Sequence, residues 1–552
     1  MARRRRRLFD PAPRRGLVLF SGGPAPRPAR RRRPGRAVGL LALVAVLGVG
    51  GYVAWDSFIR SDDSGAQRRA AAVRFVAGWE RHDPGAMWHA LTPRARATHP
   101  LARFTASYRS ADAAARVKSV RAGRLRAERG GRITFAVSVR TRDFGTLRGF
   151  VGLPVSGKGA TAGVDWATAL RLPGLRAGED VRVKAGQPPS RGDILAVGGT
   201  LLDATALGAS IAGTTGKKPS GLERLYNDRL GGHPSERLLF GNRQIAKVPA
   251  VPGRSIHTTI HPGLMATAQA ALGNKLGGIA VLRPSDGAVL ALAGLAVSAP
   301  QPPGSTFKII TVSEALTHGI ATPSTTYPDR TFAMLSGVKL RNASNESCGG
   351  TLTQAFIDSC NSVYAPLGAK LGAKAIAARA KAFGFGELPN IPAVKASTIG
   401  TPADLRDDIA VGATSIGQDK DLATPLEMAS VAATIAAGGR RARPRIVTAD
   451  PVLRRKVVSA KVAHEVREMM LGVVRSGTGT AAAVPGVEVA GKTGTAELVA
   501  NSKSAGSSDA WFVAFAPAQH PKVAVAVMLV GAGFGGSSAA PIARRVLVAA
   551  LG

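Results

Sequence analysis

A break of two prolines and a glycine, followed at once by a serine and a lysine three positions apart, is the feature that most constrains this chain. Residues 302–308 read PPGSTFK and lead into an apolar helical pattern, which predicts a helix that starts near Ser305. Positions i and i+3 share one face of a helix, so the Lys308 amine can reach the Ser305 hydroxyl. A hydroxyl beside a general base is the minimal arrangement of an activated serine nucleophile. The free N–H groups of a helix N-terminus also favour developing negative charge.

Two further motifs follow in the chain and give the first one its meaning. Ser359 and Asn361 form a Ser-x-Asn pattern, and residues 491–495 read GKTGT. The three motifs, in this order and roughly 50 and 130 residues apart, resemble the penicillin-binding protein and serine β-lactamase family. Similar segments of that family are found at residues 412–429, 476–481 and 535–541.

The resemblance covers residues 255–552 closely. It implies an α/β/α sandwich in which the nucleophile stands at a helix start beside the edge of the sheet. Apolar runs flank a Pro-Ser-Asp-Gly turn at 284–287, which predicts a hairpin of the strands 278–282 and 288–292. Two more strands are predicted near the C-terminus, at 511–515 and 523–530.

Five motif residues are expected to carry out an acyl transfer. Ser305 is the candidate nucleophile, and Lys308 can take its proton only when the amine is neutral. Bringing the pKa of Lys308 from about 10.4 to about 7 requires roughly 4 to 5 kcal/mol of differential destabilisation. Burial and a second cation, for which Lys492 is the candidate, both act in that direction. By resemblance, Ser359 relays a proton to the leaving amine and Asn361 holds the lysine and the substrate amide.

The Lys-Thr-Gly-Thr segment is expected to recognise the substrate. By resemblance, Lys492, Thr493 and Thr495 bind its terminal carboxylate, and Gly494 lets a substrate backbone approach the strand. The backbone N–H groups of Ser305 and Thr495 would form the oxyanion hole. Strict strand alternation sends the side chains of Lys492 and Thr495 to opposite faces, so both serve only if the edge strand twists.

The reaction that the resemblance implies is the cross-linking of peptidoglycan stem peptides. Ser305 would attack a D-Ala-D-Ala amide, release D-alanine and pass the acyl group to an amine of another stem peptide. β-Lactams would acylate the same serine and stay. We expect no metal site and no cofactor. The sequence leaves open whether division, elongation or sporulation is served, and which acceptor amine is used.

Three other functions are compatible with parts of the sequence. A β-lactam sensor or a serine β-lactamase shares the three motifs, although no obvious omega-loop glutamate is present. A catalytically inactive scaffold would be the non-enzyme alternative, but every motif residue is intact. A bifunctional enzyme is disfavoured because no glycosyltransferase motif follows the N-terminal region. The resemblance therefore implies a class B, monofunctional enzyme with a separate polytopic glycosyltransferase as a partner.

The N-terminal region predicts a membrane anchor. Residues 1–36 hold thirteen arginines, and no charge lies between Arg36 and Asp56. The apolar run 37–55, roughly 28 Å long as a helix, is enough to span a bilayer, with the N-terminus in the cytoplasm and everything after residue 56 outside. A cleaved signal peptide is disfavoured because the apolar run is long. The formal charge of +39 does not predict nucleic-acid binding, since arginine runs before a span usually mark topology.

Two regions lie between the predicted span and the catalytic domain. A helix pair followed by strand-like alternation at 132–139 makes residues 65–185 resemble the NTF2-like α+β juxtamembrane domain of some cell-wall transpeptidases. Trp79, Met87 and Trp88 are expected there as core residues rather than ligand contacts. Residues 190–254 begin with an Arg-Gly-x-Ile type segment that resembles the entry to a pedestal or dimerisation-like domain. Residues 213–242 are expected to be a loop with short helical pieces.

The chain has two cysteines, and both are predicted outside the cell. Cys348 and Cys360 lie twelve positions apart, and the second stands inside the Ser-x-Asn motif. An oxidising compartment permits a disulfide between them. Sequence alone leaves a disulfide and two free thiols as open alternatives.

Overall fold

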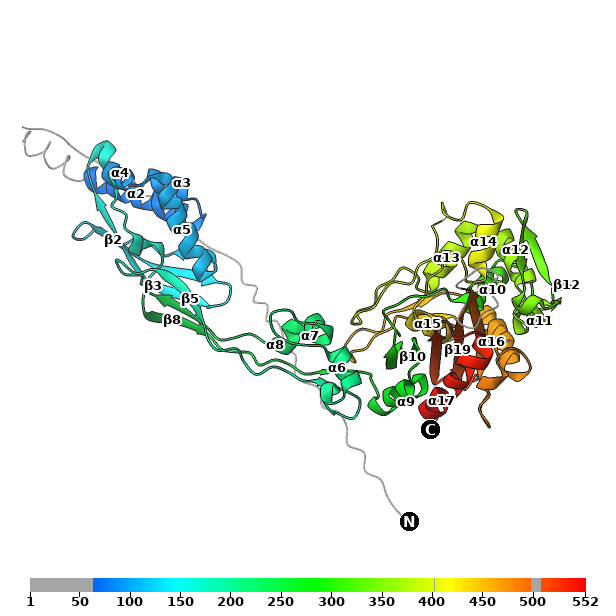
Figure 1. Ribbon diagram of the computed structural model, residues 1–552. Coiled ribbons are helices and arrows are strands. Elements are labelled where there is room, and N and C mark those ends of the chain that lie inside the picture. The colour runs from blue at the N-terminus through cyan, green and yellow to red at the C-terminus, as the bar shows by residue number, and fades with distance from the viewer. Residues whose placement is uncertain (1–62, 402, 498–507) are drawn as a thin grey trace, which may run out of the picture.

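The computed structural model describes residues 63–401, 403–497 and 508–552. The predicted tail 1–36 and the predicted span 37–55 lie outside these residues. Among the helices that are described, none is both long and apolar enough to cross a membrane. Buried apolar side chains form two separate clusters, which correspond to the two units at opposite ends of Figure 1.

The first unit packs four helices against an antiparallel sheet with the strand order β1-β2-β3-β4. Its helix pair and the strand at 132–139 were predicted, and both are confirmed, so the unit is α+β. The break between the first two helices is set by Asp83, whose side chain accepts a hydrogen bond from the Ala86 N–H and caps the second helix. The elements are α2 (Asp63–Glu80), α3 (Pro84–His89), α4 (Pro93–Thr98), α5 (Leu101–Ala115), β1 (Val117–Ala122), β2 (Arg132–Thr141), β3 (Thr146–Ser156) and β4 (Gly163–Val164).

A second sheet belongs to the same end of the molecule. It joins β5 (Val181–Ala185), β7 (Glu236–Phe240) and β8 (Arg243–Val248) in antiparallel order. The expectation of a loop through residue 242 was therefore wrong for 236–240. Leu238 and Phe240 alternate into the core of the first unit, and their pairing partner β5 lies some fifty residues earlier in the sequence.

The segment between β5 and β7 packs at the other end. Its apolar side chains, such as Leu202 and Leu222, belong to the cluster of the second unit. Residues 190–254, expected to be one pedestal domain, thus divide between the two cores. The elements of this segment and its parallel partner are β6 (Ile194–Leu195), α6 (Ala206–Ala212), α7 (Gly221–Leu225), α8 (Asn227–Gly231) and β9 (Ile256–His257).

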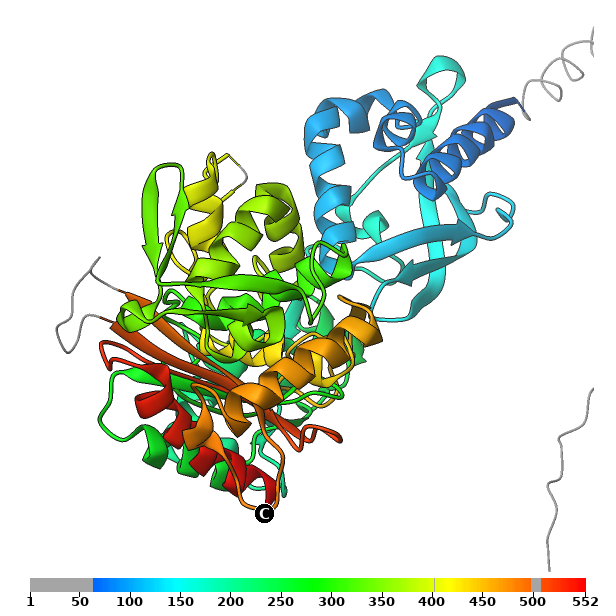
Figure 2. The same ribbon diagram turned by 90° about the vertical axis from the view of Figure 1, so that its right-hand side faces the viewer.

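The second unit is built on a five-stranded antiparallel sheet with the order β11-β10-β20-β19-β18. Its central strands are apolar on both faces because helices cover both, α9 and α17 on one side and α15 and α16 on the other (Figure 2). The predicted α/β/α sandwich and its predicted strands are confirmed. The bounds are α9 (Pro262–Leu272), β10 (Gly277–Arg283), β11 (Ala288–Gly294), α15 (Pro425–Ala436), α16 (Ala460–Arg475), β18 (Ala490–Glu497), β19 (Ser508–Ala516), β20 (Val523–Leu529) and α17 (Ala540–Leu551).

Helices and short strand pairs between β11 and α15 bring the motif segments to the edge strand β18. Thr351 caps α11 by accepting a hydrogen bond from the Gln354 N–H at 3.1 Å. The elements are α10 (Lys308–Thr317), β12 (Thr326–Arg330), β13 (Phe332–Leu335), β14 (Val338–Arg341), β15 (Cys348–Thr351), α11 (Leu352–Ile357), α12 (Asn361–Leu371), α13 (Ala373–Phe383) and α14 (Asp408–Ser415). A further short strand pair, β16 (Arg440–Ala442) and β17 (Arg454–Lys456), follows α15.

Candidate active site

Ser305 stands in a tight turn that leads directly into α10. Residues Gly304–Phe307 form a 3₁₀ turn, and Lys308 is the first residue of the helix. Residues three apart eclipse one another in a 3₁₀ turn, so Ser305 and Lys308 share one face, as predicted. Ser305 is half-buried and Lys308 is fully buried. Between these two described residues there is no direct hydrogen bond, because the lysine amine is bound elsewhere.

The Lys308 amine is held by the Ser-x-Asn segment. Its Nζ donates to the Ser359 carbonyl oxygen at 2.6 Å and to Asn361 Oδ1 at 2.7 Å, and it lies 3.3 Å from Ser359 Oγ. The orientation of the Asn361 amide is set by its Nδ2, which donates to the Arg341 carbonyl oxygen at 2.8 Å. The amine thus donates short hydrogen bonds to two fixed acceptors, and a neutral lysine amine has two N–H groups.

Lys492 approaches the same serine from β18. Its Nζ donates to Ser359 Oγ at 2.8 Å and to the Thr493 carbonyl oxygen at 3.1 Å. Ser359 adopts a left-handed backbone conformation, with φ of 66°, between α11 and α12. This conformation is uncommon for a residue other than glycine and is frequent at functional sites. The Ser359 hydroxyl thus lies between both motif lysines.

Burial perturbs both amines. Desolvation lowers the pKa of Lys308 well below its usual value, and the charge of Lys492 acts in the same direction. Desolvation lowers the pKa of Lys492 to about 7, against a smaller opposing effect of Asp358. The prediction that Lys492 favours a neutral Lys308 agrees with these directions.

Two aromatic rings lie under the lysines. Lys308 Nζ is 5.5 Å from the ring centroid of Tyr364, and Lys492 Nζ is 5.5 Å from that of Phe356. Both rings are fully buried and contact each other edge to face. Because the face of an aromatic ring attracts a cation, these two rings partly offset the cost of burying the two amines. Sequence reasoning missed these residues, although each lies three positions from a motif residue on a neighbouring helix.

Gly494 allows β18 to pack closely against the turn that carries Ser305. A Cβ atom there would lie 2.7 Å from the Pro303 carbonyl oxygen and 2.9 Å from Thr306 Cγ2. The close approach at this glycine is thus to the chain's own turn, and an approach of a substrate backbone remains a prediction. Gly304 plays a matching role, because a Cβ atom there would lie 2.6 Å from the Thr495 carbonyl oxygen and its φ of 53° is left-handed.

Thr493 and Thr495 lie on the face of β18 opposite to Lys492. The pairing of β18 with β19 runs without a register shift from Ala490 to Glu497, so alternation separates Thr495 from Lys492, as the sequence analysis anticipated. Thr493 Oγ1 lies 2.6 Å from Thr478 Oγ1. Gln418 Nε2 lies 3.4 Å from the Thr495 carbonyl oxygen. Sequence reasoning quoted the segments of Thr478 and Gln418 but assigned neither residue a role.

The cysteines form a disulfide. Cys348 on β15 is bonded to Cys360, and their Cα atoms are 5.8 Å apart. Cys360 is buried between Ser359 and Asn361 in the chain, so the bond ties the Ser-x-Asn turn to a neighbouring strand. The alternative of two free thiols is excluded for this structure.

Comparison with known proteins places the site in a known context. The family of the penicillin binding protein transpeptidase domain matches residues 277–548. The chain is 34% identical over 403 residues to peptidoglycan D,D-transpeptidase PbpA of Mycobacterium tuberculosis, covering 60% of this chain and 79% of the relative. It is 30% identical over 416 residues to peptidoglycan D,D-transpeptidase MrdA of Haemophilus influenzae, covering 61% and 63%.

A solved structure shows the same fold. An imipenem acyl-enzyme complex of penicillin-binding protein A from M. tuberculosis superimposes with a TM-score of 0.56 and 31% sequence identity, covering 66% of this chain and 99% of that chain.

Proposed function

The chain belongs to the family of penicillin-binding peptidoglycan D,D-transpeptidases, and on that premise we propose that its buried network of lysines and serine activates Ser305. The enzyme cross-links stem peptides through a serine acyl-enzyme, and β-lactams acylate it. The observation that carries the proposed residue roles is the pair of fixed acceptors on Lys308. A neutral amine has two N–H groups and one lone pair. With both N–H groups given to the Ser359 carbonyl and to Asn361, the lone pair is left to accept the Ser305 proton.

Acylation then follows with a balanced proton transfer. Ser305 Oγ bonds to the carbonyl carbon of the D-Ala-D-Ala amide while its proton moves to Lys308 Nζ. The amide C–N bond breaks as the Ser359 hydroxyl gives its proton to the departing D-alanine nitrogen. Ser359 recovers a proton from Lys308 Nζ, which lies 3.3 Å away. The net result is an ester on Ser305, neutral Lys308 and free D-alanine.

Transfer to the second stem peptide reverses these steps. An acceptor amine bonds to the ester carbonyl carbon, its proton passes through Ser359 to Lys308, and the ester C–O bond breaks as Ser305 regains a proton. Lys492 donates to Ser359 Oγ throughout, which leaves the serine O–H free to face the substrate nitrogen. The low pKa of both amines supports this exchange near neutral pH.

The remaining assignments concern substrate binding. We assign the terminal carboxylate to Thr493 and Thr495, which share one face of β18, and keep Lys492 on the other face as the partner of Ser359 Oγ. We assign the oxyanion to the backbone N–H groups of Ser305 and Thr495. The close packing of Gly304 against Thr495 supports the oxyanion assignment, since it brings the two backbones together at the edge of the sheet. The Thr478 hydroxyl supports the orientation of Thr493.

The cellular setting is proposed from the sequence. The apolar run 37–55 would anchor the enzyme with its N-terminus in the cytoplasm and both folded units outside, and the enzyme is proposed to work with a polytopic glycosyltransferase. The four helices and sheet of residues 63–164 support an NTF2-like juxtamembrane domain for the first unit. The division of 190–254 between two cores argues against an independent pedestal.

A labelling experiment tests the nucleophile and the reaction class together. The full-length protein in detergent is incubated with a fluorescent penicillin beside Ser305→Ala and a control, Ser324→Ala, at an exposed turn outside the site. We expect a stable adduct on the wild type and the control and none on Ser305→Ala. Turnover with hydrolysed drug would instead identify a β-lactamase. Absence of any adduct would support an inactive scaffold.

A further inference from the structure

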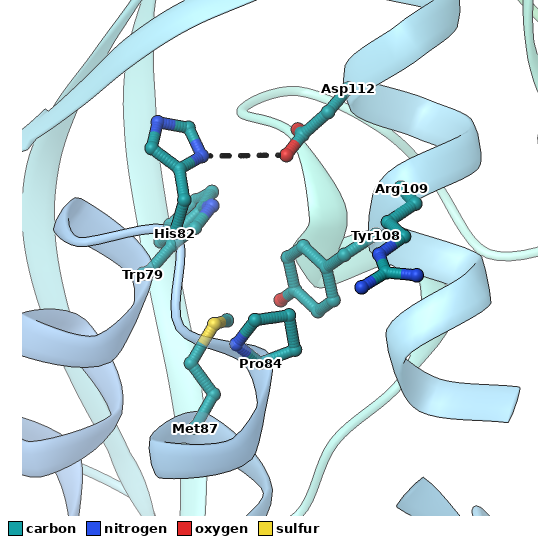
Figure 3. Close-up of a pocket in the computed structure, with 7 residues that line it drawn as sticks. All are labelled: Trp79, His82, Pro84, Met87, Tyr108, Arg109 and Asp112. Atoms are coloured by element: carbon teal, nitrogen blue, oxygen red, sulfur yellow. Dashed lines mark ion pairs between the residues drawn. The ribbon is translucent and has the colours of Figure 1, made fainter. Parts of the chain in front are cut away.

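A pocket with apolar walls and a few polar groups lies in the first unit, far in the fold from the acyl-transfer site. It has a volume of about 240 Å³ and is lined by α2, the α2–α3 turn, α3 and α5. Figure 3 shows His82 and Asp112 facing each other on one side, with Trp79, Tyr108 and Met87 turned toward the same space. Trp79 and Met87 are buried, as predicted for core residues, yet both also line this pocket.

Two polar atoms of the lining are buried without a partner among the described residues. They are the indole N–H of Trp79, a residue that is only 1% exposed, and Asp112 Oδ1. Leaving a buried donor or acceptor unpaired costs about 1 to 3 kcal/mol each, and most such groups in native proteins have a partner. The Tyr108 hydroxyl differs, because it accepts from Trp166 Nε1 and donates to the Leu170 carbonyl oxygen. One donor and one acceptor of the pocket are therefore free.

The size of the pocket exceeds what a single water needs. A cavity holds one water from about 10 to 15 Å³, so a volume of about 240 Å³ leaves room for an organic molecule. Apolar contacts come from the Trp79 and Tyr108 rings and from the Met87 thioether. Such a mixture of apolar walls and a few aimed polar groups is typical of small-ligand sites.

The charges of the lining have both signs. Arg109 and Asp112 are three positions apart on α5 and share its face, yet they form no ion pair with each other in the described structure. Asp112 instead has His82 Nδ1 at 3.6 Å, a long contact that leaves its other oxygen free. Desolvation raises the pKa of Asp112, and the nearby His82 acts in the opposite direction.

We propose that this pocket binds a small zwitterionic α-amino acid. Its ammonium group would donate to Asp112 Oδ1, and its carboxylate would accept from the Trp79 indole N–H and pair with the Arg109 guanidinium. A short aliphatic side chain would contact Met87 and the two rings. A zwitterion satisfies the free donor, the free acceptor and both charges at once. A cation or an anion alone leaves one side of the pocket unpaired.

Calorimetric titration of the full-length protein tests this assignment. The Ser305→Ala background keeps amino acids from reacting at the acyl-transfer site, so failure here is separate from failure of the proposed mechanism. The probes are D-alanine and L-alanine, with ethylamine and propionate as half-ligands. We expect saturable binding of alanine and at least tenfold weaker binding of each half-ligand.

Pocket variants locate the binding. Trp79→Phe removes the free N–H and keeps most of the ring, and Asp112→Asn removes the charge. Each is expected to weaken alanine binding at least tenfold. Trp88→Phe is the matched control, because its Nε1 already donates to the His99 carbonyl oxygen at 2.8 Å outside the pocket, and it should change the affinity less than twofold.

The exposed Arg109 gives a variant that is independent of core folding. Arg109→Gln should weaken alanine binding at least threefold while the thermal transition stays unchanged. The assignment is overturned if alanine shows no saturable binding at millimolar concentration, if a half-ligand binds as tightly, or if the pocket variants bind like Trp88→Phe.

Discussion

Replacing Gly494 by alanine should damage the site through packing alone. The added Cβ atom would lie 2.7 Å from the Pro303 carbonyl oxygen, 2.9 Å from Thr306 Cγ2 and 2.9 Å from Trp511 Cβ. Carbon contacts below 3.0 Å do not persist, so the turn or the strand must shift. The backbone of Gly494 is not left-handed, which means that strain in φ contributes nothing to this effect.

The added Cβ atom must push β18 and the turn that carries Ser305 apart, and this movement determines the loss of stability and of acylation rate. Overpacking of this kind costs about 1 to 3 kcal/mol, or about 2 to 10 °C in the Tm of the second unit. A displacement on the order of 1 Å at a reacting group can cost about 100-fold in rate. Because the atoms that must move lie one and two residues from Ser305, we expect acylation by a fluorescent penicillin to slow by about 10- to 100-fold.

A second glycine provides the control. Gly263, at the start of α9, has an ordinary φ, and a Cβ atom added there would have no other atom within 4 Å. Gly263→Ala should keep the acylation rate and gain about 0.4 to 1 kcal/mol of stability. Wild-type acylation and Tm in Gly494→Ala would refute the packing argument. A lower Tm with wild-type acylation would show that the turn moves without disturbing Ser305.

Three further predictions concern the network around this turn. Burial lowers the pKa of Lys492 to about 7, so between pH 7 and about 10 the unfolded chain binds one more proton than the folded chain. The contribution of Lys492 to the free energy of unfolding therefore rises with pH across that window. Lys492→Met should raise the Tm at pH 7, and the increase should shrink toward pH 10. Replacing Cys348 and Cys360 by serine removes a covalent bond between residues twelve positions apart and should lower the free energy of unfolding by about 2 to 3 kcal/mol. Acylation should also slow, because Cys360 lies between the motif residues Ser359 and Asn361. An unchanged acylation rate would show that the Ser-x-Asn turn keeps its conformation without the disulfide. Thr478→Val should slow acylation by carboxylate-bearing penicillins about three- to tenfold at unchanged Tm, and Thr478→Ser should restore it; equal rates for Val and Ser would remove Thr478 from the positioning of Thr493.

The parts of the site that sequence could predict are those in which spacing fixes geometry. Ser305 and Lys308 share a turn wherever a helix starts, so their relation required no tertiary information. The meeting of Lys308 with Ser359 and Asn361 required the family resemblance, because more than fifty residues separate them. The structure confirms that the three motifs converge, although the catalytic role of each residue is a proposal.

Other features depend on contacts that no local pattern contains. The strand at 236–240 pairs with β5, which lies about fifty residues earlier in the chain. Because the flanking residues are rich in glycine and charge, the sequence predicted a loop there. The tight packing at Gly494 is visible only when Pro303 is placed against β18. The disulfide depended on a Cα separation that sequence leaves undefined. No local sequence pattern distinguishes Trp166, whose Nε1 donates to the Tyr108 hydroxyl, from Trp79, whose indole N–H has no partner among the described residues.

The route of the chain between the two units has a mechanical consequence. It leaves the first unit after β5, returns to form β7 and β8, and leaves again toward β9, so three strands of covalent chain bridge the two ends (Figure 1). A single protease cut in one bridge would leave the two halves tethered by the others and by the β5–β7 pairing. Three tethers also resist twisting far better than one. Tension applied at the N-terminal end of the described residues would thus be divided among three chain segments before it reaches the second unit.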